Sequence, residues 1–313
     1  MFNPKRINKY LYVLDYPYEY YLDDFLKKGA CSTFELGRFV QKYNHLTMMP
    51  KQDSQSAGCT TFHTVDSGGN HLMGRNFDFK DGPCMVVKCS PENGYKSISV
   101  TAMNTMLYGF DWMKLNSQNE KRLFMAPYAC MDGINEKGLA IAVLELKAKP
   151  THQNTGRIPV TTSSIIRAVL DRCANADEAV ELFRSFDMNG ALFCDYHYQI
   201  VDAEGHSVVV EYVDNKLHIL DDQQYAMNFY ILPEGDNRHA MGYEREVLVR
   251  NALAKDCMSV DEAMSVLKEC RLDYRHKRGY RITCLWSAVY DCSRKSMTLC
   301  AGMDYSEKYK FEI

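Results

Sequence analysis

Short segments rich in β-branched, aromatic and other apolar residues recur along the chain from residue 59 to residue 313. Turns that contain Gly, Asn or Asp separate many of them, which is the pattern of hairpin-linked strands. Strands joined by such short turns pair antiparallel, so we predict largely antiparallel sheets. The segments are 59–65, 71–79, 85–90, 95–103, 138–147, 197–203, 206–214, 216–220, 282–292, 296–302 and 309–313.

Two helical units interrupt these strands, at residues 163–186 and 243–270. Each unit contains one helix, a short break and a second helix that begins at a capping residue. The cap is Asn175 or Asp177 in the first unit and Ser259, with Glu262 three residues later, in the second. Strands and helical pairs in this alternating order predict an α+β protein with layered helices and sheets.

The first 58 residues differ in composition from the rest of the chain, since they contain seven of the 21 tyrosines. Ser32 and Glu35 have the spacing of a capping box, which predicts a helix from about Thr33 to Tyr43. Residues 47–58, "TMMPKQDSQSAG", are small, polar or helix-breaking and are expected to form an exposed linker. A proteolytic processing site fits such a place.

Composition and charge exclude several classes of protein. Apolar residues make up 46% of the chain, charged residues 25%, and the net charge is −3, which does not favour a nucleic-acid partner. No apolar run is long enough to span a membrane and no signal-peptide core begins the chain, so we expect a cytoplasmic protein without a membrane partner. The twelve cysteines include no C-x-x-C pair, so buried, reduced thiols are expected rather than disulfides or a zinc site.

The most informative stretch is "GCTTFHTVDSGGNHLMGRNFDF", residues 58–79. Folding it about Gly68 places Cys59 opposite about residue 77, with Asp78 beside it and Arg75 opposite Thr61. Because side chains alternate between the faces of a strand, Arg75 and Asp78 would point to opposite faces. We therefore expect the second strand to end or bulge near Asn76, so that both can face Cys59.

This arrangement fits a cysteine that becomes an N-terminal nucleophile. If the bond between Gly58 and Cys59 were cut, the α-amine of Cys59 would have a pKa of roughly 7.7–8.0, which suits a general base near neutral pH. Arg75 would favour the thiolate and Asp78 would accept a hydrogen bond from the amine. The alternative is that Cys59 is one more buried thiol and that Arg75 and Asp78 form a surface ion pair.

The same stretch resembles the start of the mature chain in N-terminal-nucleophile cysteine hydrolases of linear amides. These include choloylglycine hydrolases, penicillin V acylases and acyl-CoA:6-aminopenicillanic acid acyltransferases. The resemblance covers roughly residues 57–313 and implies a four-layer αββα sandwich, in which two antiparallel sheets are flanked by helices. It also implies a helical prosegment at 1–58, removed or retained after cleavage, and a catalytic domain at 59–313.

Three later motifs add candidate site residues through the resemblance. "MDGINEKGLAIAVLEL" implies that Asn135 contacts substrate, "YAMNFY" implies that Asn228 completes an oxyanion hole, and "GYEREVLVRNAL" implies that Arg245 supports the site. Met227 departs from the Thr that often precedes the oxyanion asparagine. From the residues alone, Asn135 could instead be a turn residue and Arg245 a solvated helix start.

The function that follows is cleavage of a small N-acyl amide through a thioester at Cys59, with no cofactor or metal ion. Acyl transfer to an amine, or a non-catalytic binding protein on the same scaffold, are the alternatives. Assembly as a homo-oligomer and the identity of the amide are left open. The basic cluster at 271–281 is expected to be a solvated loop, with attraction of an anionic substrate group as the alternative, and residues 105–128 could line an acyl pocket or belong to the core.

Overall fold

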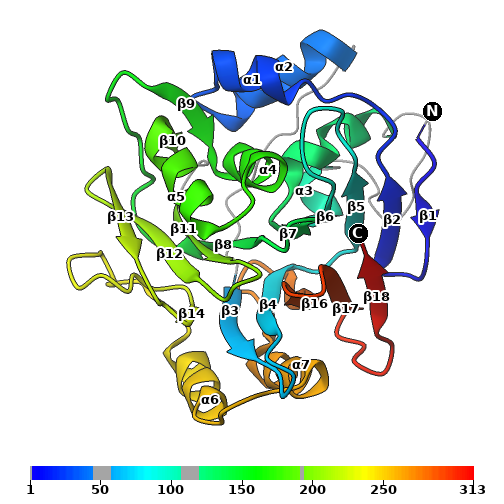
Figure 1. Ribbon diagram of the computed structural model, residues 1–313, viewed down its shortest axis with the longest axis vertical. Coiled ribbons are helices and arrows are strands. Elements are labelled where there is room, and N and C mark those ends of the chain that lie inside the picture. Colours follow the sequence, from blue (N-terminus) through cyan, green and yellow to red (C-terminus); the bar gives the residue numbers. More distant parts are fainter. Residues whose placement is uncertain (1, 45–57, 107–119, 191–193) are drawn as a thin grey trace.

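The computed structural model describes residues 2–44, 58–106, 120–190 and 194–313 of the chain. Its helices and strands are arranged in stacked layers (Figure 1). Most of the predicted linker at 47–58 lies outside the described residues, and so does most of the candidate pocket stretch at 105–128.

One sheet has seven strands and carries the predicted hairpin. Strand β3 (Gly58–Val65) pairs antiparallel with β4 (His71–Lys80), and the order across the sheet is β14-β3-β4-β16-β17-β18 with β15 paired to β16. The hairpin turn was correctly predicted at residues 66–70. The other members are β14 (Tyr225–Ala226), β15 (Asp273–Arg275), β16 (Arg281–Asp291), β17 (Ser296–Ala301) and β18 (Tyr309–Glu312).

The second sheet has nine strands in the order β1-β2-β5-β6-β7-β8-β11-β12-β13. All its neighbours pair antiparallel except β2 and β5. A separate parallel pair joins β9 (Ile158–Thr161) to β10 (Phe186–Asn189). The nine strands are β1 (Lys5–Arg6), β2 (Leu11–Asp15), β5 (Cys84–Cys89), β6 (Ser97–Ala102), β7 (Asp132–Asn135), β8 (Ala140–Leu146), β11 (Asp195–Val201), β12 (Ser207–Val213) and β13 (Lys216–Leu220).

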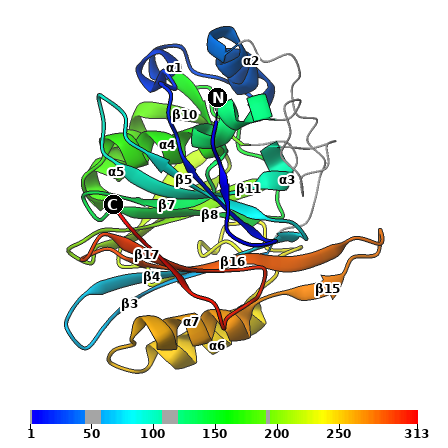
Figure 2. The same cartoon turned by 90° about the vertical axis from the view of Figure 1, so that its right-hand side faces the viewer.

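The helices form the two outer layers, as Figure 2 shows. Helices α4 (Thr162–Arg172) and α5 (Ala176–Ser185) cover the nine-stranded sheet, and α6 (Tyr243–Leu253) and α7 (Val260–Cys270) cover the seven-stranded sheet. The predicted caps at Asn175 and Ser259 are both present, the latter as a capping box with Glu262. A short α3 (Met103–Met106) and the 3-10 helix η1 (Glu120–Ala129) stand between β6 and β7 in the chain.

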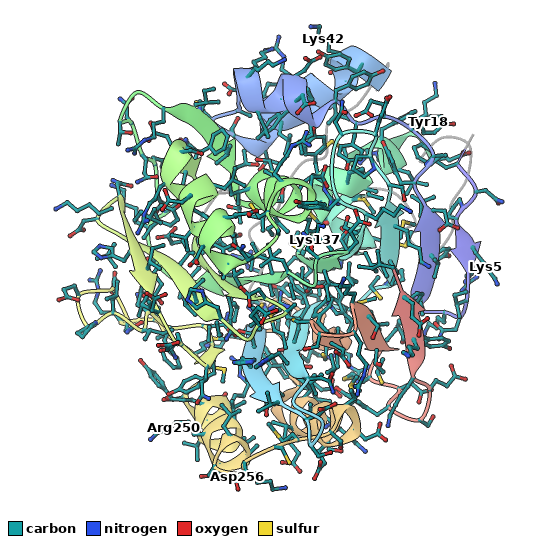
Figure 3. The ribbon with its side chains drawn as sticks, in the orientation of Figure 1. Lys5, Tyr18, Lys42, Lys137, Arg250 and Asp256 are labelled. Atoms are coloured by element: carbon teal, nitrogen blue, oxygen red, sulfur yellow. The ribbon has the colours of Figure 1, made fainter. Side chains whose placement is uncertain are left out.

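Three apolar cores separate the four layers. One lies between the nine-stranded sheet and its helices, one lies between the two sheets, and one lies between the seven-stranded sheet and α6 and α7. Charged side chains such as Lys5, Lys42 and Arg250 project outward at the rim (Figure 3). The predicted αββα sandwich is confirmed, and Cys59 belongs to the core between the sheets.

The N-terminal segment contains more than the predicted helix. Helix α2 (Thr33–Asn44) is present, and Ser32 accepts from the Glu35 backbone N–H, although Glu35 accepts from Cys31 rather than from Ser32. Helix α1 (Leu22–Lys28) precedes it, and β1 and β2 form the edge of the nine-stranded sheet. The segment therefore contains two strands besides its two helices, and β2 extends the nine-stranded sheet alongside β5.

Candidate active site

The register of the hairpin places the first candidate residues as the sequence predicts. Cys59 pairs with Phe77, and Thr61 pairs with Arg75. Gly58 pairs with Asp78, so the carboxylate lies across the ladder from the bond between Gly58 and Cys59. The two ends of this short hairpin therefore bring a cysteine, an arginine and an aspartate together.

The predicted irregularity near Asn76 is absent from β4. Strand β4 continues to Lys80, and its ladder with β3 has no register shift. The bulge lies instead on the other neighbour, β16, between Cys284 and Trp286. Arg75 and Asp78 consequently lie on opposite faces of the sheet, and each approaches residue 59 from its own side.

Arg75 interacts with the thiol of Cys59 from the face between the two sheets. Burial raises the pKa of the Cys59 thiol, while the positive charge of Arg75 and the Glu145 backbone N–H lower it. Arg75 is completely buried, and its terminal nitrogens Nη1 and Nη2 have no nitrogen or oxygen acceptor in the described residues. A buried guanidinium needs partners, and the thiolate would be a suitable one.

A second carboxylate fixes Arg75 in this position. Asp132 accepts a hydrogen bond of 2.8 Å from Arg75 Nε. It also accepts from Trp286 Nε1 at 3.1 Å and from the Tyr290 hydroxyl at 2.5 Å. Burial raises the pKa of Asp132, and Arg75 acts against that shift. Three donors on one carboxylate hold it in place, so the free end of the arginine faces Cys59.

Sequence reasoning missed Asp132. It stands in β7, in the motif "MDGINEKGL", three residues before the asparagine that attracted attention. A buried arginine in β4 needs a buried carboxylate from elsewhere in the chain, because an isolated charge is costly to bury. The partner of Arg75 is therefore expected among the acidic residues that stand in apolar strands, and Asp132 is one of them.

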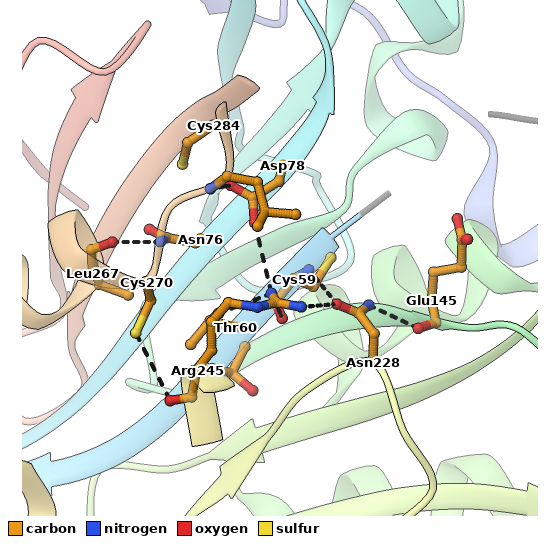
Figure 4. A network of polar contacts seen from close by, with 12 residues as sticks. Cys59, Thr60, Asn76, Asp78, Glu145, Asn228, Arg245, Leu267, Cys270 and Cys284 are labelled. Atoms are coloured by element: carbon orange, nitrogen blue, oxygen red, sulfur yellow. Dashed lines mark hydrogen bonds and ion pairs between the residues drawn. The ribbon is translucent and has the colours of Figure 1, made fainter. Parts of the chain in front are cut away.

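Asn228 and Arg245 meet at the backbone of Cys59, as Figure 4 shows. The Cys59 backbone N–H donates to Asn228 Oδ1 at 2.7 Å, and Arg245 Nη1 donates to the Cys59 carbonyl at 2.7 Å. Arg245 Nη2 also donates to Asn228 Oδ1 at 2.9 Å, and Asn228 Nδ2 donates to the Glu145 carbonyl at 2.8 Å. The structure therefore brings both side chains to the backbone of Cys59.

Arg245 is buried rather than solvated, although it stands at the start of α6. Gly242, immediately before the helix, has a φ of +102°, which favours glycine. A Cβ there would stand 2.7 Å from Arg245 Nη2. The glycine thus leaves the space through which the arginine reaches Cys59.

Asp78 lies on the α7 side of the sheet. Its Oδ1 accepts from the Leu272 backbone N–H at 3.1 Å, and its Oδ2 is 3.8 Å from Arg245 Nη1. Oδ2 is buried and accepts no hydrogen bond from a nitrogen or oxygen donor in the described residues. Burial raises the pKa of Asp78 to about 6, against the opposing effects of Arg245 and the Leu272 N–H.

Asn135 is not brought to this group of residues. Its Nδ2 donates to the carbonyls of Leu170 and Cys173, and its Oδ1 accepts from the backbone N–H groups of Lys137 and Leu139. All the hydrogen-bonding capacity of the amide is therefore used by the turn after β7 and by the end of α4. The geometry supports the turn alternative for Asn135.

The described part of the chain contains no group of three or more His, Cys, Asp or Glu side chains arranged to hold a metal ion. None of its helices is long and apolar enough to cross a bilayer. All twelve cysteines are free thiols, most of them buried.

The comparison with known families agrees with this geometry. The profile of the linear amide C-N hydrolases, choloylglycine hydrolase family, matches residues 59–229, which is more than half of the chain. The chain belongs to this family. Members of the choloylglycine hydrolase family are hydrolases that act on C–N bonds in linear amides. The match begins at Cys59, the first residue of the proposed mature chain.

Individual relatives of the choloylglycine hydrolase family share either low sequence identity with this chain or only a short part of its length. A penicillin V acylase from Pectobacterium atrosepticum is 32% identical over 110 residues, which is 31% of this chain and only 28% of the relative. The crystal structure of a mutant conjugated bile acid hydrolase from Clostridium perfringens superposes with a TM-score of 0.57 and 15% identity over 82% of this chain and 92% of that one. Penicillin V acylase from Agrobacterium tumefaciens gives 0.57 and 19% over 82% and 86%. These likenesses show the fold of N-terminal-nucleophile hydrolases.

Proposed function

We propose that this protein is made as a precursor, cuts itself between Gly58 and Cys59, and then hydrolyses a small N-acyl amide through a thioester at Cys59. The observation that carries the proposal is the group of contacts at residue 59. Asn228 and Arg245 hold its backbone N–H and carbonyl, and the positive charge of Arg75 acts on its thiol. A structural core cysteine needs none of these contacts.

In the first reaction the Cys59 sulfur attacks the carbonyl carbon of Gly58. The C–N bond breaks, the proton lost by the thiol is taken up by the departing nitrogen, and a thioester joins Gly58 to the sulfur. Water then hydrolyses the thioester, which leaves a carboxylate on Gly58 and restores the thiol. The cut converts the Cys59 amide nitrogen into an α-amine at the point now held by Asn228.

The new amine supplies the base for the second reaction. It takes the thiol proton as the sulfur attacks the substrate carbonyl and passes a proton to the leaving amine. Oδ2 of Asp78, buried and without a nitrogen or oxygen donor in the described residues, would accept from the new α-ammonium. Asn228 Nδ2 carries two N–H bonds, of which Glu145 accepts one, so the second is available to an oxyanion.

Residues 1–58 would stay bound after the cut. Strand β2 pairs with β5 over five residues, and the Ala30 backbone N–H donates to Pro159. Burial of each large apolar side chain contributes about 1.5–3 kcal/mol, so loss of the segment would expose much of one core. The residues concerned are Phe2, Tyr12, Leu14, Tyr16, Tyr20, Leu22, Phe25, Leu36, Phe39 and Val40.

The hydrolase is tested by incubating purified protein with penicillin V and with glycine- and taurine-conjugated bile salts, and by following release of the amine. The structural relatives are a conjugated bile acid hydrolase and a penicillin V acylase, so these amides are the first probes. Wild type should release amine from at least one N-acyl amide in a broader panel, and Cys59→Ala should release none. The proposal would be overturned if Cys59→Ala released as much amine as wild type and the Cys59 thiol of wild type never formed an acyl adduct.

A further inference from the structure

A buried histidine and glutamate lie behind Asn228. His197 is in β11 and Glu211 is in β12, and both side chains are completely buried. His197 Nδ1 is 2.8 Å from Glu211 Oε1, and His197 Nε2 is 2.6 Å from the Met227 carbonyl oxygen. Met227 immediately precedes Asn228, so this pair contacts the backbone that carries the candidate oxyanion residue.

Counting protons defines the state of the pair. The Met227 carbonyl can only accept, so Nε2 must carry a proton. A second proton must lie between Nδ1 and Glu211 Oε1, because two lone pairs would repel at 2.8 Å. Glu211 also accepts from the backbone N–H groups of Ile231 and Leu232, at 2.9 and 3.1 Å, which favours a carboxylate. The geometry therefore corresponds to an imidazolium paired with a carboxylate.

The pair holds a segment that has little regular structure of its own. After β14 the chain runs through residues 227–232 without a helix or a ladder, apart from one bridge between Asn228 and Met241. His197 fixes this segment at the Met227 carbonyl, and Glu211 fixes it at Ile231 and Leu232. Three backbone groups on both sides of Asn228 are thus tied to β11 and β12.

We propose that the His197–Glu211 ion pair is a positioning device that sets the orientation of the Asn228 amide against Cys59. Asn228 must place Oδ1 at the Cys59 nitrogen and Nδ2 at the Glu145 carbonyl at the same time, with contacts of 2.7 and 2.8 Å. A displacement of about 1 Å at such a site can cost on the order of 100-fold in rate. The pair resists that displacement because charge-assisted hydrogen bonds are short and strong.

This inference builds on the proposed function, but its first test does not need activity. In a Cys59→Ala background the side-chain amide resonance of Asn228 is assigned by its disappearance in Asn228→Asp. Glu211→Gln, which keeps the shape but removes one acceptor and the charge, should shift that resonance. Nitrogen-15 spectra should show both His197 ring nitrogens protonated at neutral pH. An unshifted Asn228 resonance, or one unprotonated ring nitrogen, would overturn the proposal.

The second test uses the active enzyme. Glu211→Gln and His197→Gln should lower kcat and the rate of self-cleavage by about 10- to 100-fold with little change in KM. Gln199→Met is the matched control, because Gln199 is also buried in β11 but donates to Ser207 and Gln223. Losses in kcat as large in the control would mean a merely structural role. A wild-type protein without activity would refute the proposed function. The spectra of Asn228 and His197 would still decide whether the ion pair positions the Asn228 amide.

Discussion

Gly58 faces Asp78 across the β3–β4 ladder with no room for a side chain between them. An ideal Cβ on Gly58 would stand 3.1 Å from Asp78 Oδ2 and 2.3 Å from Leu272 Cδ1. The requirement for glycine at this position is steric, because Gly58 lies in the extended strand β3 and is enclosed by neighbouring side chains.

Gly58→Ala should therefore slow self-cleavage by about 10- to 100-fold, because the added methyl group displaces the carbonyl that the thiol attacks. The rate is measured as loss of full-length chain on denaturing gels. Gly190→Ala is the control, since its Cβ would meet neighbours only at 3.3 Å and lies away from Cys59. Cleavage of Gly58→Ala at the wild-type rate would show that crowding at residue 58 is irrelevant.

Site residues close together in the sequence could be predicted to meet, whereas partners from distant segments could not. The register of Cys59, Arg75 and Asp78 followed from the hairpin because a tight turn fixes the register of its two strands, whereas the bulge expected near Asn76 did not form. The partner of Arg75 was not predicted, because Asp132 comes from the other sheet and no local pattern links them.

The parts of the fold that could be predicted were likewise those that depend on residues close together in the sequence. The layered α+β order followed from local periodicity, and the caps at Asn175 and Ser259 followed from short-range spacing. Strand β2 was missed because its five residues pair in parallel with β5, a strand distant in the sequence. Tertiary pairing of this kind leaves little trace in sequence.

Arg75→Lys and Asp132→Asn should both slow alkylation of Cys59 by iodoacetamide at pH 7. Arg75→Lys replaces the planar guanidinium by a compact ammonium group, and Asp132→Asn removes the carboxylate that holds Arg75 in place. In both variants the positive charge that opposes the raised pKa of the thiol is displaced from it. The rate at Cys59 is followed by peptide mass spectrometry. Arg167→Lys, in a buried ion pair with Asp171, is the control and should leave the Cys59 rate unchanged. Equal rates in wild type and Arg75→Lys would contradict the role given to Arg75.

Asp78 should make the precursor less stable as pH rises from about 4 to about 6. Its pKa is about 6 in the folded chain, above the usual 3.8, so the folded state binds the proton more tightly in that window. The unfolding free energy of Cys59→Ala then falls by up to about 3 kcal/mol, as denaturant unfolding at each pH would show. Adding Asp78→Asn should remove this fall. The same slope with and without Asp78→Asn would disprove the assignment.

The N-terminal segment should remain necessary after cleavage. Phe25 is fully buried, with its ring 5.3 Å from Phe39 and 5.4 Å from Tyr128. Phe25→Ala should destabilise the cleaved enzyme by about 3–5 kcal/mol, seen as a lower Tm. Phe34→Ala, at an exposed residue of α2, should change Tm little. An unchanged Tm for Phe25→Ala would mean that residues 1–58 leave the folded protein.

The most direct measurement is the intact mass of the purified chain under denaturing conditions. Under these conditions wild type should give two masses, for residues 1–58 and 59–313. Under native conditions the two pieces should appear together in a single complex. Cys59→Ala should give only the full-length mass. A wild-type chain that stays full length after prolonged incubation, with Cys59 unreactive to alkylation, would contradict the claim that the working enzyme begins at Cys59.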